Sequence, residues 1–342
     1  MATRAVRLVD VAAQAGVSIA SASRALSGSG GISPAAAEHV RRVAAELGYV
    51  ANAHARSLAG GTRTNIGLIV HEIGDPYFTE IADGVLRLST ERGLAVQICH
   101  SGRDATTELT QIRTLVAHQV GSIIIAGSGY VDPQVESAAQ AELARFQEEG
   151  GRVAVVGRHS IRADAVLPDN VAGGRAIAEH LLGLGHRHIA IATGPRALTT
   201  ITDRLTGMAE AFAAHGLDLD ESRIFEAAFT HDGGVSAAAQ ITRAAPETTA
   251  IIALNDAMAI GVLAQLRELG LRCPDDIAVT GFDDIAVAAH LGPPLTTIRL
   301  PMHQLGEIAL SMTLERPASR PRRRSTGHEL VVRGSTDGKP QR

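Results

Sequence analysis

From residue 65 onward, short apolar runs alternate with longer stretches that have helical periodicity. This alternation predicts parallel β-strands, each followed by a helix, in sheets that are covered on both faces. Eight such runs within about 270 residues favour two doubly wound lobes over a single sheet. The apolar runs lie at 66–70, 95–99, 122–126, 153–156, 188–192, 224–227, 250–254 and 277–280, and helical stretches lie at 78–92, 108–118, 171–184, 203–215, 234–244 and 258–269.

Polar and aromatic side chains follow the ends of these runs. Ligands of doubly wound sheets bind beyond the carboxyl ends of the strands, which here places a ligand between the two lobes. Carboxylates and amides bind hydroxyl groups, Arg204 offers a planar fork, and Phe78 or Phe229 can stack on an apolar ring face. We therefore expect a polar small molecule in the cleft. The candidate contacts are Asp75, Tyr77, Phe78, Arg158, Arg204, Phe229, Asn255 and Asp283.

Three residues near these positions have a structural alternative. Asp256 either contacts the ligand or caps the helix that follows it. Asp284 either faces the cleft or pairs with a local charge, and Tyr77 either contacts the ligand or packs in the core. The sequence leaves these alternatives open.

The first 58 residues have a different pattern, which predicts a small all-helical head. Apolar residues recur at helical spacing over 8–15, and Gly16 stands where a chain that leaves a helix needs a positive φ. Ser18 can then cap a second helix, which packs an apolar stripe formed by Ala22, Ala25 and Leu26 on the first. Two short helices joined by a glycine turn form a helix-turn-helix.

The outer side of the second helix fits a major groove of double-stranded DNA. Ile19, Ala20, Ser21 and Ser23 are small enough to approach base edges, and Arg24 is a candidate for bidentate contact to guanine. A third helix begins after its cap Ser33 and ends at Gly48, which closes a three-helix core.

The head resembles the lactose-repressor (LacI/GalR) family. The family's pattern is met without a gap by DVA at 10–12, AGVS at 15–18, SRAL at 23–26 and LGY at 47–49. The resemblance implies base reading by Ile19, Ala20 and Arg24. It implies DNA contacts also from Ser18, Ser21, Ser23, Ser33, Asn52 and Ala55.

The resemblance also implies a hinge helix at 52–58 that orders on DNA. Its Leu58 would wedge between base pairs in the minor groove, which costs a few kcal/mol of unstacking and opens a bent groove to more protein. The chain departs from the family pattern at Ser27 and Ala37, which puts phosphate contacts there in doubt. It also has Ala51 where the family has proline, which restricts the hinge entry less.

The body extends the resemblance to about residue 336. The matching segments are NIGLIV at 65–70, DPYF at 75–78, GHRHI at 185–189, ND at 255–256, GFDD at 281–284, PLTTI at 294–298 and LVVRGS at 330–335. The family's body resembles periplasmic sugar-binding proteins, in which the chain crosses three times between lobes. Some members place an aspartate at the Gly157-Arg158 position, so a contact from Arg158 would indicate a different or anionic effector.

These observations predict a division of the chain. We expect a helix-turn-helix domain at 1–50, a hinge helix and linker at 51–64, an effector-binding and dimerisation core at 65–336, and a polar tail at 337–342. Within the core we expect lobe one at about 65–168 plus 299–322, and lobe two at about 169–298 plus 323–336.

Charge supports this division. Residues 1–63 hold seven arginines and three acidic residues, a net charge of +4, so the remainder is at −8. A basic head suits binding to phosphate, although a solvated face is an equally good explanation of the difference taken alone.

Composition bears on location and on metal binding. No apolar run approaches the ~20 residues of a membrane span, and the N-terminus has no secretory core, so we expect a cytoplasmic protein that does not bind membranes. Cys99 and Cys273 lie far apart, and no Cys or His spacing could hold zinc.

Two rival classes are a nucleotide-dependent enzyme and a transport-associated binding protein. No G-x-x-x-x-G-K or G-x-S-x-G pattern occurs, and GSGG at 28–31 follows a helix and not a strand. We therefore expect no enzyme and no cofactor. The resemblance implies a transcription regulator, a repressor, that binds a pseudo-palindromic operator as a homodimer and is controlled by a small-molecule effector, a sugar or sugar derivative.

Overall fold

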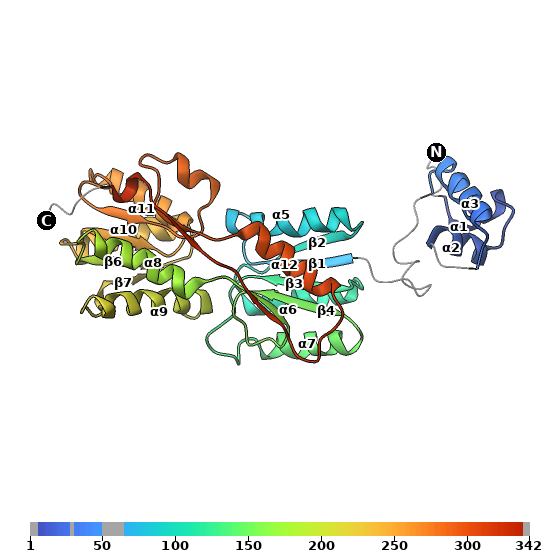
Figure 1. Ribbon diagram of the computed structural model, residues 1–342, viewed down its shortest axis with the longest axis horizontal. Helices are drawn as coiled ribbons and strands as arrows, with labels where there is room; N and C mark the ends of the chain where they lie inside the picture. Colours follow the sequence, from blue (N-terminus) through green and yellow to red (C-terminus); the bar gives the residue numbers. More distant parts are fainter. Residues whose placement is uncertain (1–5, 28–30, 50–64, 338–342) are drawn as a thin grey trace. The chain divides into compact units, whose positions relative to one another are not determined.

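A computed structural model describes residues 6–27, 31–49 and 65–337 (Figure 1). The chain divides into two compact units, Met1–Thr64 and Asn65–Arg342. We call the first the head and the second the body, and we describe each by itself. The predicted hinge contacts Asn52, Ala55 and Leu58 lie outside the described residues.

The described part of the head forms three helices around one core, α1 (Leu8–Gln14), α2 (Ile19–Ser27) and α3 (Pro34–Glu46). Gly16 turns the chain between α1 and α2 with φ +66°. The Ser18 hydroxyl then accepts from the backbone N–H of Ser21 at 3.1 Å and caps α2. Val11, Ala22 and Val40, one from each helix, are fully buried against one another. The predicted helix-turn-helix is therefore confirmed.

Lobe one of the body is built on a six-stranded parallel sheet in the order β11-β5-β4-β3-β1-β2. Side chains of β1 alternate between its faces, so Leu68 packs under α5 and α12 whereas Ile69 packs under α6 and α7. Figure 1 shows α5 and α12 side by side on one face. The strands are β1 (Asn65–Val70), β2 (Ala95–His100), β3 (Ser122–Ala126), β4 (Arg152–Val156), β5 (Asp164–Leu167) and β11 (Arg323–Ser325), and the helices are α5 (Pro76–Glu91), α6 (Ala105–Ala117), α7 (Ser137–Glu148) and α12 (Met302–Leu314).

Lobe two has a four-stranded parallel sheet in the order β7-β6-β8-β9. Helices α8 and α9 cover one face of this sheet, and α10 and α11 cover the other. The strands are β6 (Ile189–Thr193), β7 (Ile224–Glu226), β8 (Ala250–Ala253) and β9 (Ala278–Thr280), the α-helices are α8 (Asn170–Gly183), α9 (Thr199–Ala214), α10 (His231–Ala244) and α11 (Asp256–Glu268), and three 3-10 turns lie at η1 (Glu221–Arg223), η2 (Ala286–His290) and η3 (Gly334–Thr336).

Three segments connect the lobes, as the family resemblance implied. The chain leaves lobe one after β5, returns through β10 (Thr297–Arg299) and leaves again after β11, and β10 pairs antiparallel with β12 (Glu329–Val331). We expected the last crossing at residue 322. It lies after Ser325 instead, because Arg323, Arg324 and Ser325 pair with β5 and extend the first sheet.

Both lobes are therefore doubly wound α/β layers, and the predicted fold class is confirmed. Within the described residues, no helix has both the length and the apolar composition that crossing a membrane requires.

Candidate functional site

The exposed side of α2 is the first candidate site. Ala22 and Ala25 are buried in the head core, which turns Ile19, Ala20 and Arg24 to the outside. Ile19, the first residue of α2, is 53% exposed. The Arg24 Nε donates to the carbonyl oxygen of Ala20 at 3.3 Å, which holds the arginine along the helix.

The serines predicted to contact DNA lie at helix starts and beside the exposed side of α2. The Ser18 and Ser21 hydroxyls share a hydrogen bond of 2.9 Å, and Ser23 is half-buried. Ser33 accepts from the backbone N–H of Ala36 at 3.3 Å and caps α3. A capping hydroxyl accepts through its oxygen and keeps its hydrogen for another acceptor, such as a phosphate. The head thus combines small side chains, hydroxyls and one long cation on one helix and its neighbours.

The second candidate site is a cavity of about 460 Å³ in the body, between the carboxyl ends of the two sheets. The Arg103 guanidinium carbon of lobe one lies 5.5 Å from the ring centroid of Phe229 of lobe two, so the lobes must part before a sugar ring can enter between them. The side chains and backbone that line the cavity come from both lobes. They are His71, Asp75, Tyr77, Phe78, Arg103, Gly127, Ser128, Val156, Gly157 and Pro168 of lobe one, and Leu198, Thr200, Arg204, Phe229, Asn255 and Asp283 of lobe two.

Arg204 lies at the lobe-two wall and is almost fully buried. Its Nε donates to Asn170 Oδ1 at 2.9 Å, one terminal nitrogen donates to the Leu254 carbonyl, and the other donates to Asp283 Oδ1 at 3.1 Å. Its guanidinium carbon lies 3.6 Å from the ring centroid of Phe282. The arginine is therefore held rigidly before any ligand arrives, which favours specific binding.

Asp283 has an unusual backbone for an aspartate, with φ +115°. Strained backbone of this kind persists where the surroundings enforce it, often at binding sites. Burial raises the pKa of Asp283 well above its ordinary range, and the charge of Arg204 opposes this. Asp283 and Arg204 thus form a buried polar pair at the cavity wall.

Asp75, Tyr77 and Phe78 occupy the start of α5 on the opposite wall. Asp75 caps the helix by accepting from the Tyr77 backbone N–H at 3.1 Å, and burial raises the pKa of its carboxyl. The rings of Tyr77 and Phe78 meet edge to face with centroids 5.0 Å apart. Tyr77 therefore both packs and lines the cavity.

Asp256 matches neither of its two alternatives, whereas Asp284 pairs with local charges. Asn255, and not Asp256, caps α11, by accepting from the Met258 backbone N–H at 2.8 Å. Asp256 is buried behind the cavity, where it accepts from the Thr297 hydroxyl at 2.6 Å, and burial raises its pKa to about 7. Asp284 pairs with Arg299 and with Arg333, each at 2.7 Å.

Arg158 differs from its predicted placement, because it does not line the cavity. Its guanidinium crosses to lobe two and pairs with Asp203 of α9. The Oδ1 atom of Asp203 lies 2.6 Å from Arg158 Nη2 and 3.1 Å from Arg158 Nε. The Thr199 hydroxyl also donates to the Arg158 carbonyl oxygen at 2.7 Å. Arg158 therefore joins the lobes beside the cavity.

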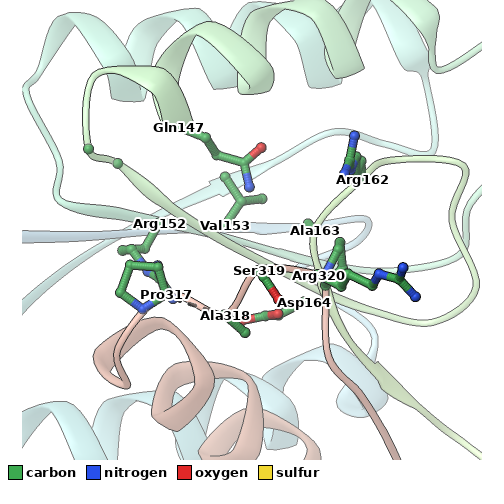
Figure 2. Close-up of a pocket in the computed structure, with 13 residues that line it drawn as sticks. Gln147, Arg152, Val153, Arg162, Ala163, Asp164, Pro317, Ala318, Ser319 and Arg320 are labelled. Atoms are coloured by element: carbon green, nitrogen blue, oxygen red, sulfur yellow. Dashed lines mark ion pairs between the residues drawn. The ribbon is translucent and has the colours of Figure 1, made fainter.

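A second hollow, of about 760 Å³, lies at the amino-terminal ends of β4 and β5 (Figure 2). Arg152, Arg162 and Arg320 surround it, and Arg152 lies 3.9 Å from Asp164. Because doubly wound sheets bind ligands beyond the carboxyl ends of their strands, the cavity between the lobes is the stronger effector site.

Comparison with known proteins gives the family. The model of bacterial regulatory proteins of the lacI family matches residues 7–52, and that of a periplasmic binding protein-like domain matches residues 178–336. The HTH-type transcriptional regulator CelR of Thermobifida fusca is 33% identical over 311 residues, which span 90% of each chain. The chain belongs to the LacI family.

Solved structures of LacI-family proteins have the same fold. The lac repressor dimer bound to operator and the anti-inducer ONPF has a TM-score of 0.85 at 26% identity, covering 97% of this chain and 99% of the other. A CelR–cellobiose complex has a TM-score of 0.71 at 31% identity, covering 96% and 99%. This LacI-family chain is thus a DNA-binding transcriptional regulator, and its relatives are regulators and not enzymes.

Sequence reasoning missed four residues of this LacI-family body that bring polar side chains to the cavity. His71 directly follows β1, and Ser128 follows β3 by two residues, so a stricter use of strand ends would have found both. Arg103 lies in the loop after β2, and Thr200 lies in the first turn of α9, which begins four residues earlier than predicted. Neither position has a signal in the sequence that aims its side chain at the cavity.

Proposed function

We propose that this LacI-family regulator is a repressor that binds a pseudo-palindromic operator as a homodimer, under the control of a carbohydrate-like effector in the cavity between the lobes. We assign operator binding to residues 1–50, the hinge to 51–64, and effector binding and dimerisation to 65–336. Closure of the lobes on the effector would change the spacing of two hinge segments and so the affinity for DNA.

One observation carries the effector assignment. Carboxylates, amide and guanidinium groups from two lobes converge on a cavity that also has the rings of Phe78 and Phe229 on its walls. Carboxylates accept from hydroxyls, arginine and asparagine donate to them, and an aromatic ring packs on the apolar face of a sugar. The relative whose solved structure holds cellobiose supports the same chemical class.

The DNA assignment rests on α2. We propose base reading by Ile19, Ala20 and Arg24, with phosphate contacts from Ser18, Ser21, Ser23 and Ser33. The exposure of Ile19 and the position of Arg24 beyond two small residues support this surface as the one that enters a major groove.

The test is selection of binding sites from random double-stranded DNA by the full-length protein, followed by titration of the selected duplex with mono- and disaccharides. We expect a palindrome whose affinity changes about 5- to 150-fold with one sugar class. Failure to enrich any sequence at low salt would overturn the operator proposal. A palindrome that responds to no sugar would overturn the effector class alone.

Arg24→Ala tests base reading at residue level. We expect a loss of about 1–3 kcal/mol on the selected operator and little change on random DNA, because a bidentate base contact adds discrimination. Arg41→Ala is the charge-matched control, since Arg41 is an exposed head arginine that pairs with Glu38 on α3. The control should weaken both DNAs equally. Equal weakening by Arg24→Ala would refute base reading.

A further inference from the structure

Arg103 is a non-glycine cavity residue of lobe one with a positive φ. It has φ +59°, directly after Gly102 at φ +62°, and non-glycine residues in this left-handed region are strained. The Arg103 carbonyl accepts from the Tyr130 hydroxyl at 2.9 Å, which fixes the loop. The result is that a loop with no regular structure holds one cation in the cavity, where its side chain is 14% exposed.

Two aromatic rings from opposite lobes enclose this cation. The Arg103 guanidinium carbon lies 5.7 Å from the ring centroid of Phe78 and 5.5 Å from that of Phe229. Aromatic rings attract a cation to their faces and leave its in-plane N–H groups unused. The edge of the guanidinium is therefore the part that remains for a ligand.

The N–H groups of Arg103 have no hydrogen-bond acceptor among the described residues. Asp75 Oδ2 lies 3.5 Å from Arg103 Nη2, an ion-pair distance that is too long for a good hydrogen bond. Asp75 already accepts from the Tyr77 backbone. Arg204 is different, because its donors go to Asn170, Leu254 and Asp283. Of these two cavity arginines, Arg103 is the one with donors left for an effector.

The charge of Arg103 is also incompletely balanced. Burial lowers its pKa by more than the charges of Asp75, Glu72 and Asp283 raise it. Burial likewise raises the pKa of Asp75, which disfavours the charged form of the nearest counter-ion. A buried cation whose counter-ion is no closer than 3.5 Å gains from a ligand that brings a negative charge.

We infer that the effector is a sugar acid whose carboxylate binds edge-on to the Arg103 guanidinium. The planar fork of arginine matches the two oxygens of a carboxylate, and its aromatic neighbours leave that edge open. A monoanion fits better than a phosphate dianion, because Asp75 lies beside the site and would repel a second charge. This inference rests on the proposed function and specifies the effector class of the same cavity.

The experiment compares sugars that differ only by the acid group. Calorimetric titration of the full-length protein would use D-glucuronate against D-glucose, D-galacturonate against D-galactose, and D-gluconate against D-glucitol. We expect one acid to bind at least about tenfold more tightly than its neutral partner, because a hydrogen bond between charged groups contributes about that much affinity. Operator release by the same acid would connect binding with regulation.

Variants assign the preference to Arg103. Arg103→Gln should abolish the preference for the acid, and Arg103→Lys, which keeps the charge but loses the fork, should retain part of it. Arg113→Gln is the control, since this exposed α6 arginine pairs with Glu142 away from the cavity. Circular dichroism would verify that each variant folds, and the lysine variant carries the test if the glutamine variant does not.

The results that would overturn this inference differ from those that would overturn the proposed effector class. An operator response to neutral sugars with no gain for the acids would overturn this inference and leave the proposed function standing. An acid preference that survives in Arg103→Gln would also overturn it. An operator complex that responds to neither class would instead overturn the proposed effector class.

Discussion

At the scale of single residues, His159 shows how burial and hydrogen bonding fix a charge. Its side chain is 1% exposed, with Nδ1 2.6 Å from Glu136 Oε1 and Nε2 2.9 Å from the Gly127 carbonyl oxygen. Because both partners are acceptors, both ring nitrogens must donate, which only the protonated imidazolium does. The charged ring therefore joins the loop after β4 to the start of α7 and to a cavity-lining backbone group.

This geometry predicts a pH-dependent stability. Burial alone lowers the pKa of His159, but Glu136, Glu108 and the Gly127 carbonyl outweigh it, so the pKa is raised in the folded protein. The stabilisation is thus complete below the unfolded value of about 6.5 and is lost as the pH rises through the folded value. Burial lowers the pKa of the nearby His71, so the contribution of His71 to stability has the opposite pH dependence and is lost as the pH falls.

His159→Gln measures this contribution. We expect urea unfolding to give a larger stability advantage of the parent over the variant at about pH 6 than at about pH 9. An advantage that is constant with pH would mean that His159 is neutral in the fold.

Seven of the eight contacts predicted from the sequence line the cavity, but the sequence did not give the direction of every side chain. Asp75, Tyr77, Phe78, Arg204, Phe229, Asn255 and Asp283 all line it, as their places at strand and helix ends indicated. Arg158 also follows a strand, but Asp203 lies near enough across the lobes to take its guanidinium. Chain position gives the edge of the sheet on which a residue lies, whereas the competing partner becomes visible only in three dimensions.

At the scale of elements, interlocked glycines set the distance between paired helices. Gly174 of α8 lies against the Arg204 carbonyl of α9, and Gly207 of α9 lies against the Val171 carbonyl of α8. The pairs α5 with α12 and α10 with α11 repeat the arrangement, through Gly84, Gly306, Gly234 and Gly261. A side chain at any of these positions would overlap the backbone of the neighbouring helix.

Gly207→Ala should therefore separate α8 from α9. We expect a loss of about 1–3 kcal/mol in the free energy of unfolding, typical of overpacking. Gly183→Ala is the matched control, because Gly183 ends α8 with open space around it. The control should be neutral or stabilising by up to about 1 kcal/mol, since alanine restricts the unfolded chain. Similar losses in both variants would show that helix contact is not the cause.

Periodicity predicted most of the long elements of the body and missed several others. The eight expected strands and six named helices are all present within a few residues at each end, the start of α9 differing most because its helix begins at Thr199. The strands β5, β10, β11 and β12 and the helices α7 and α12 were not named from the sequence. β11, with the sequence RRS, has no apolar residue at all and is a strand only because β5 offers it an edge.

At the scale of the whole body, the lobes are joined beside the cavity by contacts that need no ligand. The Arg158–Asp203 pair, the Ser128–Thr199 hydroxyl contact of 3.2 Å and the backbone bridge between Tyr130 and Leu198 all link lobe one to lobe two. Periodicity predicted two lobes, but only the resemblance implied their three crossings, and neither implied these links. These contacts between the lobes favour the closed arrangement, in which both walls of the cavity can contact an effector.

Removal of the Arg158–Asp203 pair should shift the lobes toward opening. Because a ligand that binds the closed form must then supply the lost closing energy, Arg158→Gln should raise the effector concentration for half-response about two- to fivefold. The effect is modest because the Arg158 side chain is 46% exposed, and exposed pairs contribute at most about 1 kcal/mol.

Asp203→Asn should give the same shift, and the double variant should add little to either. Arg175→Gln, which breaks the similarly exposed pair with Glu210 inside lobe two, is the control and should leave the response unchanged. Equal shifts from the two arginine variants would mean that loss of charge, and not release of the lobes, changes the response.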